Sequence, residues 1–266
     1  MFDLHSHILP GVDDGSPDVA TSLEMARIAV DDGIQLMACT PHFMPGMYDN
    51  EAQDIRRRVD ELNQRIGEAG IGLHLVVGSD AHIRPDFLPC VREGRLLTLN
   101  DSRYVLFEPP HTIMPQRLED LLFNIVAAGY IPVLTHPERL KWIEQHFSIF
   151  EQLVRIGVWM QLTGGSLTGR FGSRPKYWAE KLLASGMVHI LATDAHNPIS
   201  RPPILSDAYK IAQDKVGLDE ANNLVLVRPM HILDNEPADQ SPPLLVAQAP
   251  AVAPPFRWRR LFMGSG

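Results

Sequence analysis

Hydrophobic and polar positions alternate along the chain in a repeating order. Short apolar, β-prone runs bounded by loop residues recur seven times, at 2–4, 34–40, 73–77, 104–107, 131–135, 158–162 and 188–193. Segments with the apolar spacing of helices lie between them, at 17–31, 50–69, 115–128, 142–156, 174–184 and 203–215. Strand alternating with helix predicts an α/β fold with a mainly parallel sheet.

An eighth apolar run, at 224–227, follows two asparagines and is equally compatible with the end of a helix. We therefore count seven strands. Polar residues able to bind metals follow six of them, and this distribution bears on the shape of the sheet. An open doubly wound sheet gathers its site at one crevice, whereas a closed barrel brings all strand ends to one face. The pattern predicts a distorted seven-stranded barrel.

Nine residues suited to hard or borderline metal ions lie at or just after the ends of these runs: His5, His7, Asp14, His42, Asp80, Glu108, His136, Asp194 and His196. A strand, a helix and their loops take about 30 residues, so the candidates arrive about once per unit. The run at 158–162 contributes none and is expected to shape the cleft instead. Imidazole and carboxylate together suit zinc, manganese or iron.

Two short patterns strengthen the metal interpretation. His5-Ser6-His7 and Asp194-Ala195-His196 each place two ligands on one face, because side chains alternate along a strand. We predict a centre of two or three divalent ions at the carboxyl ends of the strands.

Composition narrows the class of protein. The 266 residues are 45% hydrophobic and 21% charged, as expected for one soluble domain. The net charge of -8 argues against nucleic-acid binding, although bound cations would make the site locally positive and admit an anionic substrate. No apolar stretch of about 18 residues and no signal-peptide pattern occur, which predicts a cytoplasmic protein. Two cysteines are too few for a disulfide framework.

The composition changes near residue 236 to a Pro/Ala-rich sequence. We predict a domain at 1–235 followed by a disordered tail at 236–266. The segment 256–263 mixes cations with aromatic residues. It is typical either of a solvated terminus or of a segment that docks on a membrane surface or a partner.

The motifs around the ligands resemble those of the PHP superfamily, named for polymerase and histidinol phosphatase. They are HSHILPGVDDG at 5–15, TPH at 40–42, Glu108, THPER at 135–139 and TDAHN at 193–197. The opening motif is similar to that of the capsule-type branch, the CpsB/YwqE-like protein tyrosine phosphatases of bacterial polysaccharide operons. The resemblance covers residues 1–235.

This resemblance implies a distorted, TIM-like (β/α)7 barrel with a trinuclear centre, of manganese first, with iron or zinc as alternatives. By matching position, it implies three ligand sets: one ion held by His5, His7 and Asp194, a second held by Glu108 and His136 and bridged to the first by Asp80, and a third held by Asp14, His42 and His196.

The chain departs from the family at Asp80. Family members commonly carry Gly-Gln-Glu where this chain has Gly78-Ser79-Asp80. Aspartate is one methylene shorter, so either the bridge is tighter or the neighbouring His82 shares the role.

The resemblance also implies catalytic roles. Arg139 and Arg201 match phosphate-binding arginines, and guanidinium binds phosphate oxygens in a bidentate manner. The implied mechanism is attack of a metal-bound hydroxide on phosphorus, with His42, His196 or a bound water as candidates to protonate the leaving group. Tyr48 and His111 lie in loops from which they could contact substrate.

The predicted function is a metal-dependent protein tyrosine phosphatase that controls capsule or exopolysaccharide synthesis. Its predicted partner is the phosphotyrosine tail of a bacterial tyrosine kinase from a polysaccharide operon. One alternative is a small-molecule phosphoesterase such as histidinol-phosphate phosphatase. Another is a non-catalytic, metal-bound module that recruits a partner. The sequence leaves open whether the protein forms a homo-oligomer.

Overall fold

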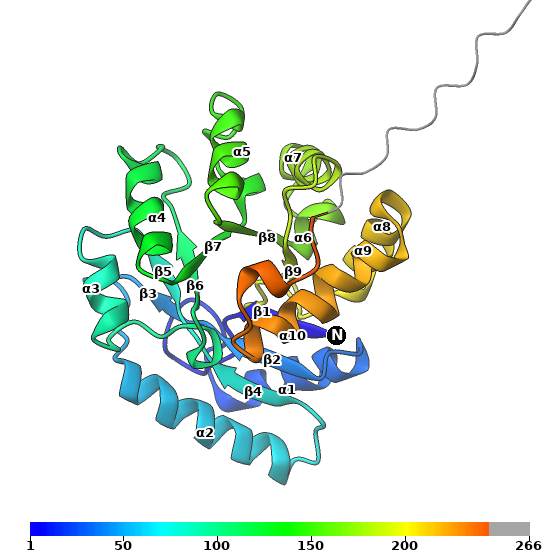
Figure 1. Ribbon diagram of the computed structural model, residues 1–266. Helices are drawn as coiled ribbons and strands as arrows, with labels where there is room; N and C mark the ends of the chain where they lie inside the picture. The colour runs from blue at the N-terminus through cyan, green and yellow to red at the C-terminus, as the bar shows by residue number, and fades with distance from the viewer. Residues whose placement is uncertain (245–266) are drawn as a thin grey trace, which may run out of the picture.

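The fold consists of parallel strands surrounded by helices (Figure 1). A computed structural model describes residues 1–244. Every pair of neighbouring strands in its two sheets runs parallel. The first sheet contains β1 (Phe2–Ser6), β2 (Leu36–Cys39) and β4 (His74–Val77). The predicted α/β class with parallel strands is therefore confirmed.

The second sheet contains six short strands in the order β3-β5-β6-β7-β8-β9. They are β3 (His42–Phe43), β5 (Asp80–His82), β6 (Tyr104–Glu108), β7 (Ile131–Thr135), β8 (Trp159–Thr163) and β9 (Ile190–Ala192). A distorted seven-stranded barrel was expected, but the described residues form nine strands in two sheets, with no closed barrel. The ladder breaks between β2 and β3, where Pro41 has no N–H to donate, and between β4 and β5 at Gly78-Ser79.

The first and last strands lie side by side. Ser6 and Ala195 form a parallel bridge, with the His7 amide donating to the Ala195 carbonyl at 2.8 Å. The Asp194 amide donates to the His5 carbonyl, also at 2.8 Å. Residues just after β9 therefore continue alongside β1, and this contact brings the two ends of the domain together.

The six predicted helices are present as α1 (Val19–Asp31), α2 (Ala52–Glu68), α4 (Leu118–Ala127), α5 (Phe147–Arg155), α7 (Ser173–Ala184) and α8 (Ser206–Val216). Helix α5 starts later than expected, because the buried Trp142 lies in the preceding turn and donates to the Pro110 carbonyl. Further short elements are α3 (Phe87–Arg92), α6 (Gly164–Leu167), α9 (Leu218–Asn222), α10 (Arg228–Leu233) and 3-10 turns at Leu99–Asp101, Pro137–Arg139 and Ala238–Gln240. The run at 224–227 lies in a π-helical segment, Asn223–Val227, and is not a strand.

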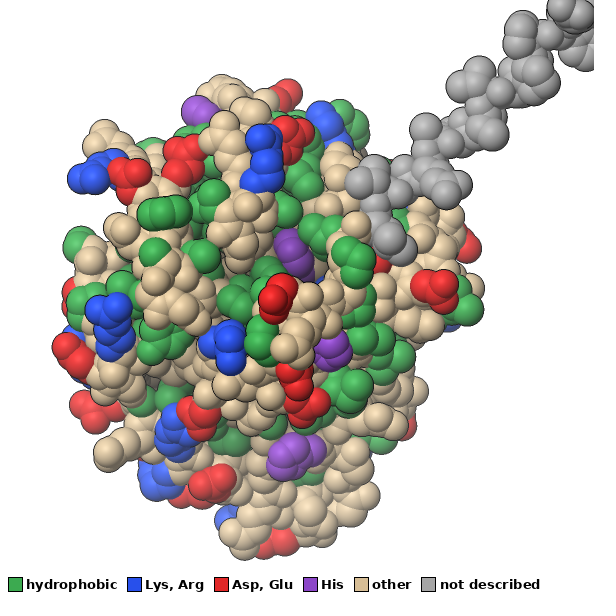
Figure 2. Space-filling view, viewed as in Figure 1, with side chains coloured by type: hydrophobic (Ala, Val, Ile, Leu, Met, Phe, Trp, Pro, Cys, Tyr) green, Lys and Arg blue, Asp and Glu red, His purple; other side chains and the backbone are tan. Residues whose placement is uncertain are grey.

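The core has an inner and an outer part. Along β6, Tyr104 and Leu106 belong to the inner cluster, whereas Val105 and Phe107 pack with the helices outside. Ile232 of α10 also belongs to the inner cluster, and Figure 1 shows α10 across the front of the strands. In the same view, Figure 2 shows hydrophobic, acidic and basic side chains intermixed over this face. This end of the strands is thus closed by protein.

The segment expected to be a disordered tail begins inside the folded unit. The Tyr104 hydroxyl donates to the Glu236 carbonyl at 2.9 Å, and Arg228 donates to the Pro242 and Pro243 carbonyls at 3.1 and 2.9 Å. A Pro-rich composition removes donors but leaves these carbonyls free to accept. The rest of the predicted tail, 245–266, including 256–263, lies outside the described residues. No helix within 1–244 is long and apolar enough to cross a membrane.

Candidate metal centre

All nine predicted ligands gather at one end of the structure, where the carboxyl ends of the strands meet. Their donor atoms form overlapping groups within 4.8 Å of one another. The groups are His7, Asp14, His42 and His196; His5, His7 and Asp80; His5, His136 and Asp194; His42, His82 and Glu108; and Glu108, His111 and His136. The structure also brings His82 and His111 into the cluster, which the sequence had left open.

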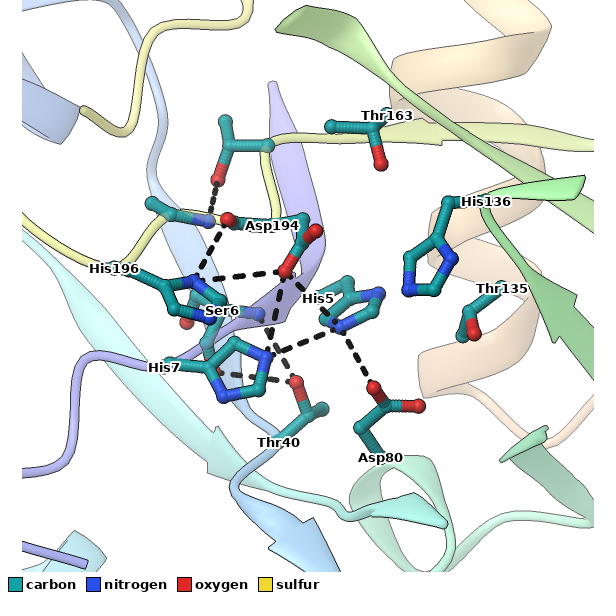
Figure 3. A network of polar contacts seen from close by, with 12 residues as sticks. His5, Ser6, His7, Thr40, Asp80, Thr135, His136, Thr163, Asp194 and His196 are labelled. Carbon is teal, nitrogen blue, oxygen red and sulfur yellow. Dashed lines mark hydrogen bonds and ion pairs between the residues drawn. The ribbon is translucent and has the colours of Figure 1, made fainter. Parts of the chain in front are cut away.

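Hydrogen bonds at the outer nitrogens orient the two histidines of β1. His5 Nδ1 lies 3.0 Å from Gln161 Oε1, and His7 Nδ1 lies 2.7 Å from Asp13 Oδ2. Their Nε2 atoms consequently point into the cluster, 3.3 Å apart (Figure 3). Such partners fix the orientation of an imidazole ligand and raise its basicity. Sequence reasoning missed both. Gln161 comes from β8, the strand expected to contribute no ligand.

Gly15 allows the acidic loop to approach His7. A Cβ at Gly15 would lie 2.1 Å from the His7 carbonyl oxygen, closer than any side chain can pack. The Gly15 amide donates to Asp13 Oδ1 at 2.9 Å. The DDG sequence therefore has a physical reason: its glycine lets the loop fold against β1, and Asp13 and Asp14 arrive at the histidines as a result.

Two ligand candidates have left-handed backbones. His136 follows β7 with φ 35°, and Asp194 lies just beyond β9 with φ 53°. This region is uncommon for residues with a side chain and is typical of functional sites. It turns both side chains toward the centre of the cluster (Figure 3).

Asp194 lies between histidines and arginines. Its Oδ1 lies 3.5, 3.4 and 3.6 Å from nitrogens of His5, His7 and His196. Its Oδ2 accepts from Arg139 Nη1 and Arg201 Nη2, each at 2.6 Å. One carboxylate thus connects the ligand cluster to the two predicted phosphate-binding residues.

The environment lowers the pKa of two carboxylates of the cluster, Asp194 and Asp14. Burial would raise the pKa of Asp194, but the nearby charges of His5 and Arg201 and a hydrogen bond from His7 hold it well below its usual range. The pKa of Asp14 is lowered first by hydrogen bonds from His196 and His42. Positive charge on neighbouring groups thus stabilises carboxylates that divalent cations would stabilise in the same sense.

Histidines in the cluster differ in their protonation. Burial and the positive charge of Arg139 lower the pKa of His136 well below its usual value, so this imidazole is neutral, the form that binds metals. Burial also opposes protonation of His7, but the charge of Asp13 and its hydrogen bond outweigh it and raise the pKa to about 10. Binding of a metal ion at His7 would therefore release a proton.

An open pocket of about 260 Å³ gives access to the cluster. Arg139 and Arg201 line it together with Tyr48, whose ring stacks on His42 at 5.4 Å between centroids. The remaining lining residues are Asp14, His42, Met44, Met47, His82, Glu108, His111, His136, Asp194 and His196. Both predicted arginines, and the loop tyrosine, therefore lie where a ligand of the cluster would enter.

Phe171 is a second contribution from the β8 unit that the sequence did not reveal. The guanidinium carbon of Arg139 lies 4.7 Å from the centroid of its ring, and that of Arg201 lies 5.8 Å away. Gly165 makes room for the ring, since a Cβ there would lie 2.9 Å from Phe171 Cε2. The ring thus supports both arginines from one side.

Comparison with known proteins places this arrangement in a family. The profile described as "Capsular polysaccharide synthesis, CpsB/CapC" matches residues 1–234, which include every candidate ligand. The chain belongs to the CpsB/CapC family. Tyrosine-protein phosphatase YwqE of Bacillus subtilis strain 168 is 36% identical over 243 residues, 91% of this chain and 95% of that protein. Tyrosine-protein phosphatase CpsB of Streptococcus pneumoniae is 28% identical and covers 88% of this chain and 98% of its own length.

A solved structure agrees with these CpsB/CapC relatives. It comes from work on YwqE of Bacillus subtilis and CpsB of Streptococcus pneumoniae, described there as unique metal-dependent tyrosine phosphatases. It superposes with a TM-score of 0.86 at 36% identity, covering 89% of this chain and 96% of the other. The metal dependence is a property of those proteins. Whether this CpsB/CapC chain can bind metals depends on the chemistry of its own residues.

The environment of Asp80 fits a metal ion. Its side chain is completely buried, yet neither carboxylate oxygen has a hydrogen-bond partner among the residues described. The nearest imidazole nitrogen, His5 Nε2, lies 3.4 Å from Oδ2 (Figure 3). A buried carboxylate without partners is costly in a protein that binds no cation. Together with the oxygen and nitrogen donors around it, this carboxylate fits a site for divalent ions.

Proposed function

We propose that this chain is a metal-dependent phosphatase that hydrolyses phosphotyrosine in protein substrates. The observation that carries the proposal is the convergence of all nine candidate ligands and two arginines at one open pocket. Membership of the CpsB/CapC family, with YwqE and CpsB named as tyrosine-protein phosphatases, supports the same reaction class.

The scaffold for this site is a distorted seven-stranded barrel of the (β/α)7 type. In this interpretation β2 continues into β3 and β4 continues into β5, so that each pair forms one bent strand. The bridge between Ser6 and Ala195 then joins the first strand to the last. The domain extends over 1–235, with the contacts of residues 236–243 covering its closed end.

Two or three divalent ions would bind here, manganese first, with iron or zinc as alternatives. Their ligands would be the sets that the resemblance implies: His5, His7 and Asp194; Glu108 and His136 with Asp80 between; and Asp14, His42 and His196. Such ions supply ionised water near neutral pH and charge neutralisation at the phosphoryl oxygens.

Arg139 and Arg201 would hold the phosphate. Both already donate to the same oxygen of Asp194 at 2.6 Å, which fixes their positions beside the cluster. Arg201 Nε is buried without a partner in the described part of the chain, so one N–H remains to donate to an anion. Guanidinium donors of this kind bind phosphate oxygens and stabilise the charge that develops during phosphoryl transfer.

The leaving group needs little help from the protein. A phenol has a pKa of about 10, so its oxygen leaves more readily than that of an alkyl alcohol. His42 and His196 line the pocket. They are the candidates for donating a proton to the phenolate oxygen of the leaving group. Tyr48 is placed to flank the substrate ring.

A cysteine nucleophile does not explain this site. Both thiols are buried, and burial raises the pKa of Cys39 and of Cys90. A catalytic cysteine requires the opposite shift, because the thiolate is the nucleophile. Neither cysteine is followed by arginine at the spacing that cysteine-dependent phosphatases use.

The physiological substrate we propose is the phosphotyrosine tail of a tyrosine kinase encoded with polysaccharide synthesis genes, met in the cytoplasm. An extended tail can reach an open pocket and be held mainly by its phosphate. A homo-oligomer is compatible with this role.

The test compares three preparations on two substrates. The protein as purified, the chelator-treated protein and the protein reloaded with Mn²⁺ are assayed with a phosphotyrosyl peptide and with histidinol phosphate. We expect peptide hydrolysis that is lost on chelation and restored by the metal. Turnover of histidinol phosphate alone would favour the small-molecule phosphoesterase. Full activity after complete removal of metal would contradict the proposal.

A non-catalytic binding module is the other alternative. It would hold the phosphorylated kinase tail without releasing phosphate, so binding and hydrolysis are measured on the same peptide. Retention of the peptide with no phosphate release, in the metal-loaded protein, would support this alternative.

A further inference from the structure

Glu108 lies between two pairs of imidazoles. Its Oε1 lies 3.2 Å from His111 Nε2 and 3.6 Å from His136 Nε2. Its Oε2 lies 2.5 Å from His82 Nε2 and 3.5 Å from His42 Nδ1. Each oxygen of this nearly buried carboxylate therefore has its own pair of imidazole neighbours. The family resemblance accounts only for the pairing of Glu108 with His136.

The Oε2 side contains buried donor atoms with no partner. Asp80 Oδ2 lies 3.6 Å from His42 Nδ1. Both oxygens of Asp80 and His42 Nδ1 are buried, and none has a hydrogen-bond partner within residues 1–244. Buried carboxylate and imidazole atoms that face one another without hydrogen-bond partners are donors suited to a divalent cation.

The sheet, not a surface loop, places His82 at this position. Residues 80 and 82 of β5 lie on the same face, because side chains alternate along a strand. In the parallel register, His42 is opposite Asp80 and His82 is opposite Glu108. Three short strands thus present His42, Asp80, His82 and Glu108 side by side, and the His82 side chain, 23% exposed, lines the pocket.

We propose that His82 is a metal ligand, binding through Nε2 an ion that it shares with Oε2 of Glu108. Glu108 would then contribute one oxygen to this ion and the other to an ion held beside His136. The assignment also accounts for the short side chain at position 80, because an imidazole two residues later supplies a donor where a longer carboxylate would otherwise reach. This inference rests on the metal-dependent function proposed above.

The competing role for His82 is a hydrogen bond to Glu108 with no metal contact. His82→Gln separates the two roles, because its amide N–H can still donate to a carboxylate but glutamine does not replace an imidazole as ligand. His74→Gln is the matched control, since His74 is the exposed first residue of β4. His82→Asn is a second variant that keeps the test informative if the glutamine variant folds poorly.

The experiment uses the full chain loaded with Co²⁺. Each histidine ligand of paramagnetic Co²⁺ gives a strongly shifted, solvent-exchangeable imidazole N–H proton signal, and the visible absorption of Co²⁺ reports its ligand set. We expect His82→Gln and His82→Asn to lose one shifted N–H signal and to change the absorption spectrum. We expect His74→Gln to match the parent protein in both.

Retention of every shifted signal in both His82 variants, with an unchanged spectrum, would overturn the assignment. These readouts do not depend on hydrolysis. A parent protein that binds Co²⁺ with the expected signals but releases no phosphate from the peptide would contradict the proposed function alone. The failures of the two proposals are therefore distinguishable.

Discussion

The two ends of the strands treat buried charge in opposite ways. At the closed end, Arg228 is completely buried and pairs with Glu220 through two contacts of 2.8 and 2.9 Å. It also donates to the carbonyls of His189, Pro242 and Pro243. At the open end, Asp80 is equally buried and has no hydrogen-bond partner in the described structure.

This contrast separates structural from functional charges. A buried ion pair whose hydrogen bonds are all made needs nothing further, and removing one partner leaves an uncompensated charge. A buried carboxylate that makes no hydrogen bond is costly, and a bound cation would lower that cost. Buried charges with hydrogen bonds lie at the closed end, whereas Asp80 at the open end has none among the described residues. This difference points to a cation site at the open end without reference to any relative.

The largest expected effect comes from removing the carboxylate charge of Asp80, which has no hydrogen-bond partner among the described residues. Asp80→Asn should lower phosphotyrosyl peptide turnover on the order of 1000-fold, because metal-ion stabilisation of the transition state is worth several kcal/mol. The metal-free variant should unfold at a higher temperature than the metal-free parent, since a buried carboxylate charge without a hydrogen bond has been removed.

Steady-state assays and thermal unfolding with chelator measure these two effects, with the exposed Asp207→Asn as control. A metal-free variant less stable than the parent would show that Asp80 is compensated within the chain, and the contrast between the two ends would fail.

The complementary change at the closed end should affect stability and leave chemistry intact. Glu220→Gln should lower the free energy of unfolding by about 3 kcal/mol, because Arg228 keeps its charge but loses its counterion. Glu180→Gln breaks a partly exposed pair with Lys215 at 3.4 Å and should cost well under about 1 kcal/mol. Urea unfolding measures both. Below the unfolding transition, kcat of Glu220→Gln should equal that of the parent. A lower kcat would show that the ion pair at the closed end influences catalysis at the open end.

The sequence was informative about the candidate ligands because most of them lie at or just after the ends of strands. Their position depends on local alternation and on motifs such as HSH and TDAH, so all nine could be named and all nine meet in the structure. The residues that orient them could not be found in this way. Gln161 contacts His5 across 156 positions of sequence, and nothing in a single glutamine of an apolar run indicates that contact.

The closed end was the least predictable region for the same reason. Its stabilising contacts join Arg228 to carbonyls in a Pro-rich segment whose composition is typical of disorder. Composition reports how much a segment can bury by itself, whereas these carbonyls are ordered by a donor in the folded domain. The split of the expected sheet into two was also missed, because apolar runs do not reveal where a ladder is interrupted.

A pH effect of intermediate size should arise at the closed end. His189 is buried, stacks on Trp159 and accepts from the Met160 amide through Nδ1. Burial, followed by the charge of Arg228, lowers its pKa to about 3. Below the ordinary histidine pKa of about 6.5, His189 binds a proton in the unfolded chain but not in the folded chain. The free energy of unfolding therefore falls as the pH falls. The loss between pH 7 and pH 5 from this group should be about 2 kcal/mol.

His189→Asn keeps an acceptor for the Met160 amide but cannot titrate. Its free energy of unfolding should therefore depend less on pH over this range than that of the parent, and urea unfolding at several pH values measures the difference. Parallel curves for the two proteins would show that His189 has the same pKa in the folded and the unfolded chain.

The smallest expected effect concerns the aromatic ring of Phe171, which lies beside the two arginines at the open end. Phe171→Leu keeps the hydrophobic volume but removes the aromatic face next to Arg139 and Arg201. Cation–π contacts contribute about 0.5–2 kcal/mol, so kcat/KM should fall about tenfold, mainly through KM, and inhibition by inorganic phosphate should weaken in parallel. Phe171→Tyr should restore both values, and the exposed Phe123→Leu should change neither. A loss of activity that tyrosine does not rescue would mean that Phe171 only fills space. Rescue would show that the β8 unit, which has no predicted metal ligand, contributes by positioning the two arginines that we propose bind the phosphate.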